Sequence, residues 1–174
     1  MLKMFSTQLT GLFQRIMEKE SFQFEDGARL LAQAPVGEGL IYIKGFQEMG
    51  AVIKEAIEGA EPLKSARTLE SSSSLSSADR VIIFTRFADD EEAVALGNKL
   101  EAEGVPFVAV AGKRTESGQP TLEQLADVFI HTNVTRPLLP TEDGTRVGFP
   151  SSIAALYIYF GLKFMIEEMV AEYE

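Results

Sequence analysis

Apolar residues recur at helical spacing near the amino terminus of the chain. Six of them between Leu2 and Ile16 lie on one face of a predicted amphipathic helix that ends near Glu20. A second, shorter helix is predicted over residues 26–34, and it stops before Pro35 because a residue that precedes proline disfavours helical angles. The chain therefore opens with two helices.

The carboxyl-terminal segment is also helical in pattern, but it is apolar around nearly its whole circumference. Pro150 is suited to the start of a helix, which we expect to reach at least Val170. Such a helix must be covered on more than one side. One side can pack on a sheet, and the other meets either a second subunit or the amino-terminal helix.

Short apolar runs bounded by glycine, proline or polar residues occupy the middle of the chain. They are typical of buried strands, and they cover residues 40–43, 81–84, 106–110 and 128–130, with a weaker candidate at 63–69. Helices are predicted between them, over residues 47–58 and 89–103, and Thr121 and Gln124 have the spacing of a capping box. This alternation predicts a parallel sheet with helices on both faces.

We expect a single domain over residues 1–174, with amino-terminal helices at about 1–34 and a long last helix at about 150–171. The seven residues 71–77 are serine apart from Leu75. They lie between two predicted strands, so we interpret them as a loop within the domain and not as a linker.

The formal charge of −10 and the pI near 4.7 make nucleic acid and anionic membranes poor partners. The chain has no cysteine, which fits a reducing compartment, and its first residues do not have the pattern of a signal peptide. Residues 153–166 are apolar but too few to span a bilayer, and they include Lys163. We therefore expect a cytoplasmic protein without nucleic acid or membrane partners.

Several common site motifs do not occur. No G-x-G-x-x-G follows the first strand and there is no P-loop sequence, so a nucleotide cofactor is not expected. With one histidine and no cysteine, a zinc site would need carboxylates almost exclusively, and we expect no metal. A phosphoacceptor receiver domain would require acidic residues at the positions of Lys44 and Thr85, so this class of domain is not expected.

The order of elements and three stretches of sequence resemble the sugar isomerase (SIS) domain family, with the phosphoheptose isomerases as the nearest type. The stretches are GLIYIKG at 39–45, ADRVIIFTR at 78–86 and AVALGNKLEAEGVP at 93–106. The resemblance implies an α/β fold of three αβα layers, with a five-stranded parallel sheet in flavodoxin-type order. It also implies a phosphosugar ligand and a homodimer formed through the amino- and carboxyl-terminal helices.

In that family, a loop after the first strand and a hydroxyl-rich loop after the third central element hold the ligand. The corresponding ligand-binding residues here are Gly45, Gln47, Glu48, Thr85 and Arg86. Gln47 and Glu48 either hydrogen-bond a sugar hydroxyl or lie on the surface of a first helical turn.

Four carboxylates at 89–92 follow Thr85, where a phosphate would otherwise be attracted. We interpret them as acids that favour the start of a helix, with Arg86 offsetting part of the repulsion of an anion. Ser71 and Ser72 either lend hydroxyls to a ligand near Thr85 or belong to a polar connector.

Isomerisation of a sugar requires an acid and a base near the carbonyl carbon. Family isomerases often use a glutamate on the helix after the first loop and a histidine on the last helix. Glu55 and Glu58 lie on the former helix, the latter contains no histidine, and His131 ends the last strand instead. These three are weak catalytic candidates, and we favour the interpretation of His131 as a loop histidine paired with the backbone.

The sequence thus favours an SIS-type carbohydrate-derivative binder resembling phosphoheptose isomerases. The alternative is a non-catalytic SIS-fold dimer that acts as a regulatory or partner-binding protein, as the missing histidine and the apolar outer helices suggest.

Overall fold

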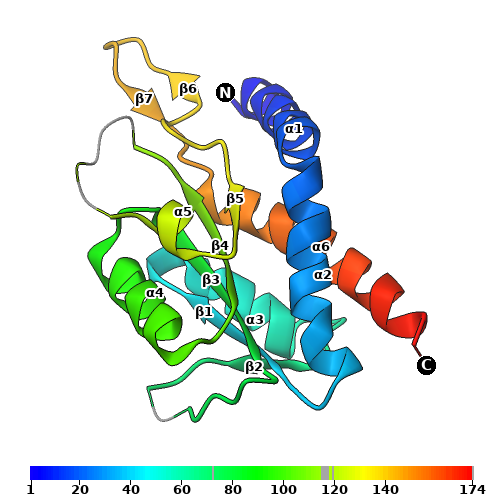
Figure 1. Cartoon of the computed structure of the whole chain (residues 1–174). Helices are drawn as coiled ribbons and strands as arrows, with labels where there is room; N and C mark the ends of the chain where they lie inside the picture. Colours follow the sequence, from blue (N-terminus) through cyan, green and yellow to red (C-terminus); the bar gives the residue numbers. More distant parts are fainter. Residues whose placement is uncertain (72, 115–117, 119, 174) are drawn as a thin grey trace.

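A computed structural model describes residues 1–71, 73–114, 118 and 120–173. Within these ranges, parallel strands alternate with helices, and a small hairpin precedes the last helix (Figure 1). The elements in chain order are α1 (Leu2–Lys19), α2 (Ser21–Val36), β1 (Ile41–Gly45), the 3₁₀ turn η1 (Gln47–Met49), α3 (Gly50–Glu58), β2 (Ala66–Thr68), β3 (Arg80–Phe87), α4 (Glu91–Glu103), β4 (Phe107–Gly112), α5 (Leu122–Leu125), β5 (Val128–His131), β6 (Leu139–Pro140), β7 (Arg146–Val147) and α6 (Ser151–Ala171).

The main sheet has five parallel strands in the order β2-β1-β3-β4-β5. This is the flavodoxin-type order that the resemblance implies, so the predicted fold class is confirmed. The weak strand candidate at 63–69 forms the short edge strand β2, and its three residues pair with β1. The strand order switches direction at β1, and ligands of open α/β sheets bind outside the carboxyl ends of strands at such a point.

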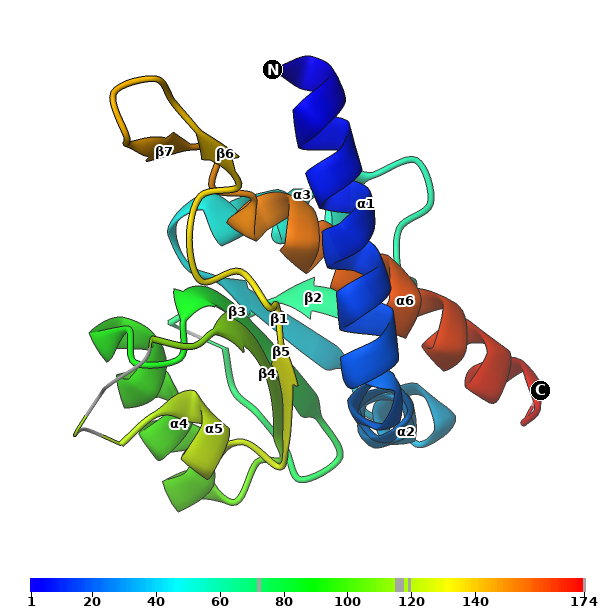
Figure 2. The ribbon, with the colours of Figure 1, turned by 90° about the horizontal axis from the view of Figure 1, so that it is seen from above.

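Alternate residues of the strands face two separate hydrophobic clusters. Ile43, Phe84 and Val110 lie in the cluster that α2, α3 and α6 cover, whereas Ile83 and Phe107 lie in the cluster under α4 and α5. Figure 2 shows these helix groups on opposite sides of the sheet. The strands are buried on both faces, which explains why their sequences are continuous apolar runs.

The second helix is longer than its sequence pattern indicates. It spans Ser21–Val36 and contains Pro35, so the prediction that it starts at residue 26 and stops before the proline is wrong at both ends. Proline has no N–H to donate at this position. The amides of Gly37 and Gly39 still bond the carbonyl oxygens of Gln33 and Ala34 beyond it, and α2 packs against α6.

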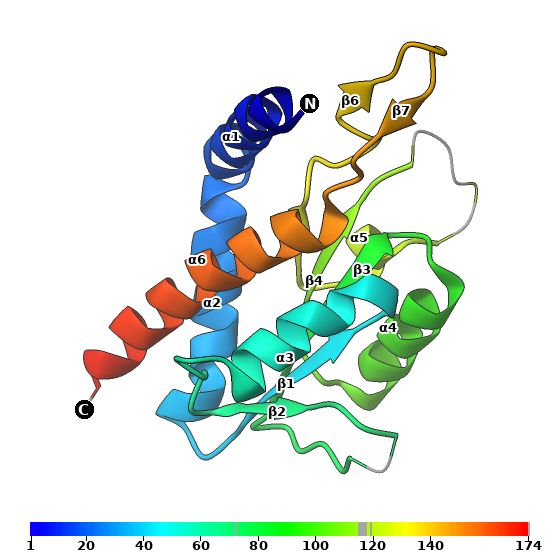
Figure 3. The same cartoon turned by 180° about the vertical axis from the view of Figure 1, so that it is seen from behind.

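The last helix is covered from several sides, as its all-round apolar sequence requires. The helices α2 and α3 pack along it, and the ring of Phe13 on α1 stacks on Tyr157 with centroids 4.5 Å apart. The sequence left open whether a second subunit or the amino-terminal helix covers the outer side of α6, and α1 packs there. Figure 3 shows α6 crossing this side of the sheet.

A two-stranded antiparallel hairpin, β6–β7, was not predicted from the sequence. Its strands have only two residues each, and Thr141, Asp143 and Thr145 close its tip by side-chain hydrogen bonds. It follows β5 and precedes α6 in the chain, and it projects from the rest of the molecule (Figure 1). Hydrophobic alternation over two residues is too short to signal a strand.

Among the described residues, none of the helices combines the length and the apolar character needed to cross a bilayer.

Gly45 allows the end of β1 to lie directly against the backbone of η1. Replacing Gly45 tests whether this close contact matters for stability. A Cβ atom at Gly45 would lie 2.3 Å from the carbonyl oxygen of Met49, which is closer than such atoms can come. We expect Gly45→Ala to lower the free energy of unfolding by about 2 kcal/mol or more, as forced overpacking does. Urea unfolding followed by circular dichroism measures the change.

Gly50→Ala is the matched control, because a Cβ at this helical position meets no atom within 4 Å. We expect it to leave stability unchanged or raise it by up to about 1 kcal/mol. Equal losses in both variants would show that the close contact at Gly45 does not matter.

Candidate functional site

The carboxyl ends of β1 and β3 lie side by side. Gly45 is in register with Phe84, and the amide of Phe46 donates to the carbonyl oxygen of Phe84 at 2.9 Å. Gly45 and Thr85, both predicted ligand-binding residues, therefore lie near the carboxyl ends of neighbouring parallel strands. This edge of the sheet is where a ligand is expected.

Two donors just before α4 are already used by an internal carboxylate. Asp90 accepts the hydroxyl of Thr85 at 2.6 Å and the backbone N–H of Phe87 at 3.0 Å through the same oxygen. Its other oxygen lies 3.3 Å from a guanidinium nitrogen of Arg114. Thr85 is fully buried, so its hydroxyl serves Asp90 and not an incoming anion.

A small cavity of about 260 Å³ adjoins this carboxylate. Gln47, Thr85, Asp90, Glu91 and Glu92 contribute its polar lining. Gln47 has a positive φ of 53°, which the tight turn after β1 imposes. The cavity is dominated by carboxylates and repels phosphate. Glu91 and Glu92 stand in the first turn of α4, where negative charge complements the helix dipole, as the sequence indicates.

Arg86 and Glu48 form a bidentate ion pair, with nitrogen–oxygen distances of 2.8 and 2.7 Å. The hydroxyl of Ser151, at the start of α6, donates to Glu48 at 2.6 Å. The hydrogen bond from Arg86 is the main cause that lowers the pKa of Glu48 from 4.5 to about 2, against the opposing effect of burial. Both predicted ligand-binding side chains are thus bonded to each other, and they connect η1, β3 and α6.

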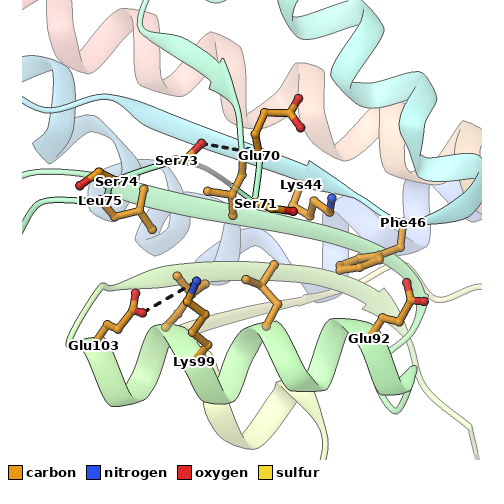
Figure 4. Close-up of a pocket in the computed structure, with 13 residues that line it drawn as sticks. Lys44, Phe46, Glu70, Ser71, Ser73, Ser74, Leu75, Glu92, Lys99 and Glu103 are labelled. Carbon is orange, nitrogen blue, oxygen red and sulfur yellow. Dashed lines mark hydrogen bonds and ion pairs between the residues drawn. The ribbon is translucent and has the colours of Figure 1, made fainter.

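A larger pocket of about 610 Å³ lies between α4 and the serine loop, here residues 69–77 without 72 (Figure 4). It opens at the carboxyl ends of β1 and β2. Its lining consists of hydroxyls, charged side chains and an apolar floor, namely Ser71, Ser73, Ser74, Lys44, Lys99, Glu70, Glu92, Glu103, Phe46, Leu69, Leu75, Leu96 and Leu100.

Two lysines supply positive charge to this pocket. Lys44 points to the α4 side of the sheet, with its amino group 5.5 Å from the centre of the Phe46 ring. Lys99 lies on α4, 3.9 Å from a carboxylate oxygen of Glu103. Lys44 has no ion pair with any carboxylate of the described residues, so its charge is available to a ligand.

Hydrogen bonds stabilise the serine loop internally and attach its carboxyl-terminal end to the domain. Ser73 accepts the amide of Glu70 at 3.0 Å, and the buried carboxylate of Asp79 accepts the amide and hydroxyl of Ser76 as well as the amide of Leu40. Asp79 thus attaches the loop to the start of β1. Ser72, a predicted ligand-binding residue, lies outside the described residues, whereas Ser71 lines the pocket.

The three catalytic candidates are not brought together in either cavity. Glu55 and Glu58 lie on α3, across the sheet from the pocket, where Glu58 pairs with Lys54 at 2.6 Å. His131 ends β5, and its backbone amide donates to Glu20 at 3.1 Å. Burial, assisted by the charge of Lys113, lowers the pKa of His131 to about 4, so its ring is neutral at pH 7.

Sequence reasoning missed Lys44, Phe46 and Lys99 as site residues. The alternation of side chains along a strand could have identified Lys44. Residues two apart lie on the same face of a strand, so Lys44 lies with Tyr42 on the face of β1 that α4 covers. Lys99 and Leu96 are separated by one helical turn, which gives them a common face.

Replacing Glu48 with glutamine tests the ion pair with Arg86. Because the folded pKa of Glu48 is about 2 and the ordinary value is 4.5, the carboxylate contributes its full stability above the ordinary value and loses it as pH falls through the folded pKa. At pH 7 we expect Glu48→Gln to lower the free energy of unfolding by about 1–2 kcal/mol. Urea unfolding at pH 7, 4 and 3 should show a shallower acid-induced loss in the variant.

Glu58→Gln serves as its control, since the Glu58 side chain is 62% exposed and its pair with Lys54 is solvated. A change below about 0.5 kcal/mol is expected there. If Glu48→Gln kept the full pH dependence of the parent protein, Glu48 would not be its source.

The structure has relatives among solved proteins. The sugar isomerase domain of the RpiR transcription factor from Sphaerobacter thermophilus aligns over 99% of this chain and 94% of that chain, with a TM-score of 0.61 and 13% identity. The hypothetical protein MJ1247 from Methanococcus jannaschii, whose crystal structure infers a molecular function of 3-hexulose-6-phosphate isomerase, aligns over 98% of this chain and 89% of that chain, with a TM-score of 0.63 and 13% identity. These likenesses establish an SIS-type fold.

At the level of sequence, the uncharacterized protein YwjG of Bacillus subtilis (strain 168) is 42% identical in an alignment of 174 positions that covers 99% of each protein. A family model described as a domain of unknown function, DUF2529, matches residues 1–170. The chain therefore belongs to the DUF2529 family.

Proposed function

We propose that this protein binds a carbohydrate derivative, a phosphorylated sugar, in the pocket between the serine loop and α4. The observation that carries the proposal is the pocket itself. Its volume of about 610 Å³ falls in the range of small-molecule sites, and it lies at the carboxyl ends of β1 and β2.

The chemistry of the lining supports a hydroxylated ligand with one anionic group. Ser71, Ser73 and Ser74 offer hydroxyls that can donate to or accept from sugar hydroxyls. Lys44 offers a positive charge beside them, where a phosphate would form a charge-assisted hydrogen bond. For the MJ1247 protein, which has the same fold, action on a hexulose phosphate is inferred, and this favours the same ligand class.

The phosphate of such a ligand would lie near Lys44 and not at the start of α4. The Thr85 hydroxyl and the Phe87 amide already bond Asp90, and Glu91 and Glu92 add negative charge at that end. Because like charges repel strongly in a partly desolvated cavity, an external phosphate is disfavoured there. In this proposal Arg86 does not contact the ligand. It remains bonded to Glu48 and stabilises the carboxyl edge of the sheet.

Heptose phosphates are the first ligands to test, since the sequence resembles phosphoheptose isomerases. The proposal concerns binding, for which Glu55, Glu58 and His131 are not needed. It includes action in the cytoplasm, which the absence of cysteine from the sequence supports.

Lys44→Met tests the proposed phosphate contact. We expect a heptose phosphate or glucose 6-phosphate to bind the parent protein in isothermal titration calorimetry, and Lys44→Met to weaken binding at least about tenfold through loss of one charge-assisted hydrogen bond. Lys54→Met is the control, because Lys54 is an exposed residue of α3 on the other face. No heat and no thermal shift at millimolar concentrations of these ligands would refute the proposal.

An alternative function is that of a regulatory SIS-fold dimer. It is favoured by large apolar side chains exposed on the outer helices, among them Met17, Phe22 and Phe164 at 55%, 77% and 54% exposure. Met17 and Phe164 border an apolar hollow of about 360 Å³ together with Tyr157 and Phe160. The RpiR protein, whose sugar isomerase domain has this fold, is a transcription factor.

In this alternative, two copies associate through the amino- and carboxyl-terminal helices. Size-exclusion chromatography with light scattering should give twice the 19.1 kDa of one chain. Phe164→Glu should give the monomer mass, because a carboxylate is costly to bury in an apolar interface. Asn98→Glu, an exposed position on α4, should remain a dimer, and a monomeric parent protein would exclude the alternative.

A further inference from the structure

The floor of the pocket between α4 and the serine loop is part of the hydrophobic core. Leu69 and Leu100 are buried members of the cluster under α4, with 7% and 1% exposure. Phe46, Leu75 and Leu96 pack against the same cluster but are only half-buried, and they line the pocket. They come from three separate segments, the turn after β1, the serine loop and α4.

A plain sugar phosphate would not use this apolar floor. Its surface is hydroxyls and charge, and pressing these groups against Phe46, Leu75 and Leu96 would remove them from water without hydrogen bonds. An apolar group in the same place would gain free energy in proportion to the area that it buries. The floor therefore favours a ligand with an apolar part.

The geometry points to a ligand class, and we propose it on the basis of the function proposed above. The pocket takes a carbohydrate derivative that carries an acyl or aryl substituent in addition to its hydroxyls and one anionic group. The substituent lies on the apolar floor, the hydroxyls face Ser71, Ser73 and Ser74, and the anionic group meets Lys44.

The charges around the pocket limit the ligand further. Glu92 lines one end of the α4 wall and Glu103 the other, so a second anionic group at either end would be repelled (Figure 4). The class with one anionic group is therefore preferred to a nucleoside diphosphate or a bisphosphate. A small molecule is preferred to a peptide or a second copy, because the cavity is concave and bounded by the loop and the helix, with the volume of a small-molecule site.

Two probes that differ in one substituent test this inference. Glucose 6-phosphate and N-acetylglucosamine 6-phosphate have the same charge and ring, and only the second carries an acyl group. We expect calorimetry to show the acylated probe binding at least about fourfold more tightly to the parent protein, the factor for burying one methyl-sized group.

Leu96→Asn should reduce the ratio of the two affinities from about fourfold to about one, because the side chain keeps its size and loses its apolar surface. Leu96→Met should retain the preference. Ala95→Ser, at an exposed neighbouring position on α4, controls for general effects on the helix. Preserved circular dichroism and unfolding midpoints show that each variant is folded.

The outcomes separate this inference from the proposed function. Equal affinity for the two probes would refute the inference that the ligand carries an acyl or aryl substituent. The proposal that the protein binds a sugar phosphate would remain. If Leu96→Asn still prefers the acylated probe, the substituent does not bind on the apolar floor, and the proposed position of the substituent is wrong. Binding of neither probe, together with no response to heptose phosphates, removes the proposed function and this inference with it.

Discussion

The close approach of β1 to the turn that follows it is the constraint on which the carboxyl edge of the sheet depends. Gly45 has no side chain, so the backbone of Met49 can fold directly over the end of the strand. The turn then presents Glu48 to Arg86 from β3 and to Ser151 from α6. One small residue thereby allows three elements to meet at a charged and partly buried junction, and Phe46 is left facing the other side, toward α4.

Charge divides this edge of the sheet into two zones. At the start of α4, Asp90 satisfies the donors of Thr85 and Phe87, as a bound anion would do in a phosphate-binding loop. Beside it, Lys44 and the serine loop line the pocket in which we propose that the ligand binds. In that proposal, the favourable position for an anion lies at the neighbouring strand end and not at the start of the helix.

Most of the architecture could be predicted from the sequence because buried parallel strands leave continuous apolar runs, as at β3 and β4. The ends of elements were less predictable. The interior of a helix usually excludes proline, but α2 includes Pro35 in its last turn, where the amides of Gly37 and Gly39 continue the backbone hydrogen bonds. The hairpin β6–β7 was invisible because strands of two residues have no period to detect.

The neighbouring strand ends were predictable from the sequence, whereas the side-chain contacts around them were not. Strand order alone sets Gly45 beside Phe84. In contrast, the pairing of Arg86 with Glu48 joins residues 38 positions apart, and the apolar floor combines Phe46 and Leu96 from two separate elements. Such contacts depend on side-chain directions in three dimensions, which neither periodicity nor motif spacing encodes.

The projecting hairpin has a practical consequence for this molecule. Its tip at Asp143 and Gly144 is held by its own hydrogen bonds, and the residues around it are exposed. Extra residues inserted there would lengthen a self-contained loop at little entropic cost. The tip is therefore a suitable place for a fluorophore or an affinity handle, leaving both chain ends and the groove along α4 unaltered.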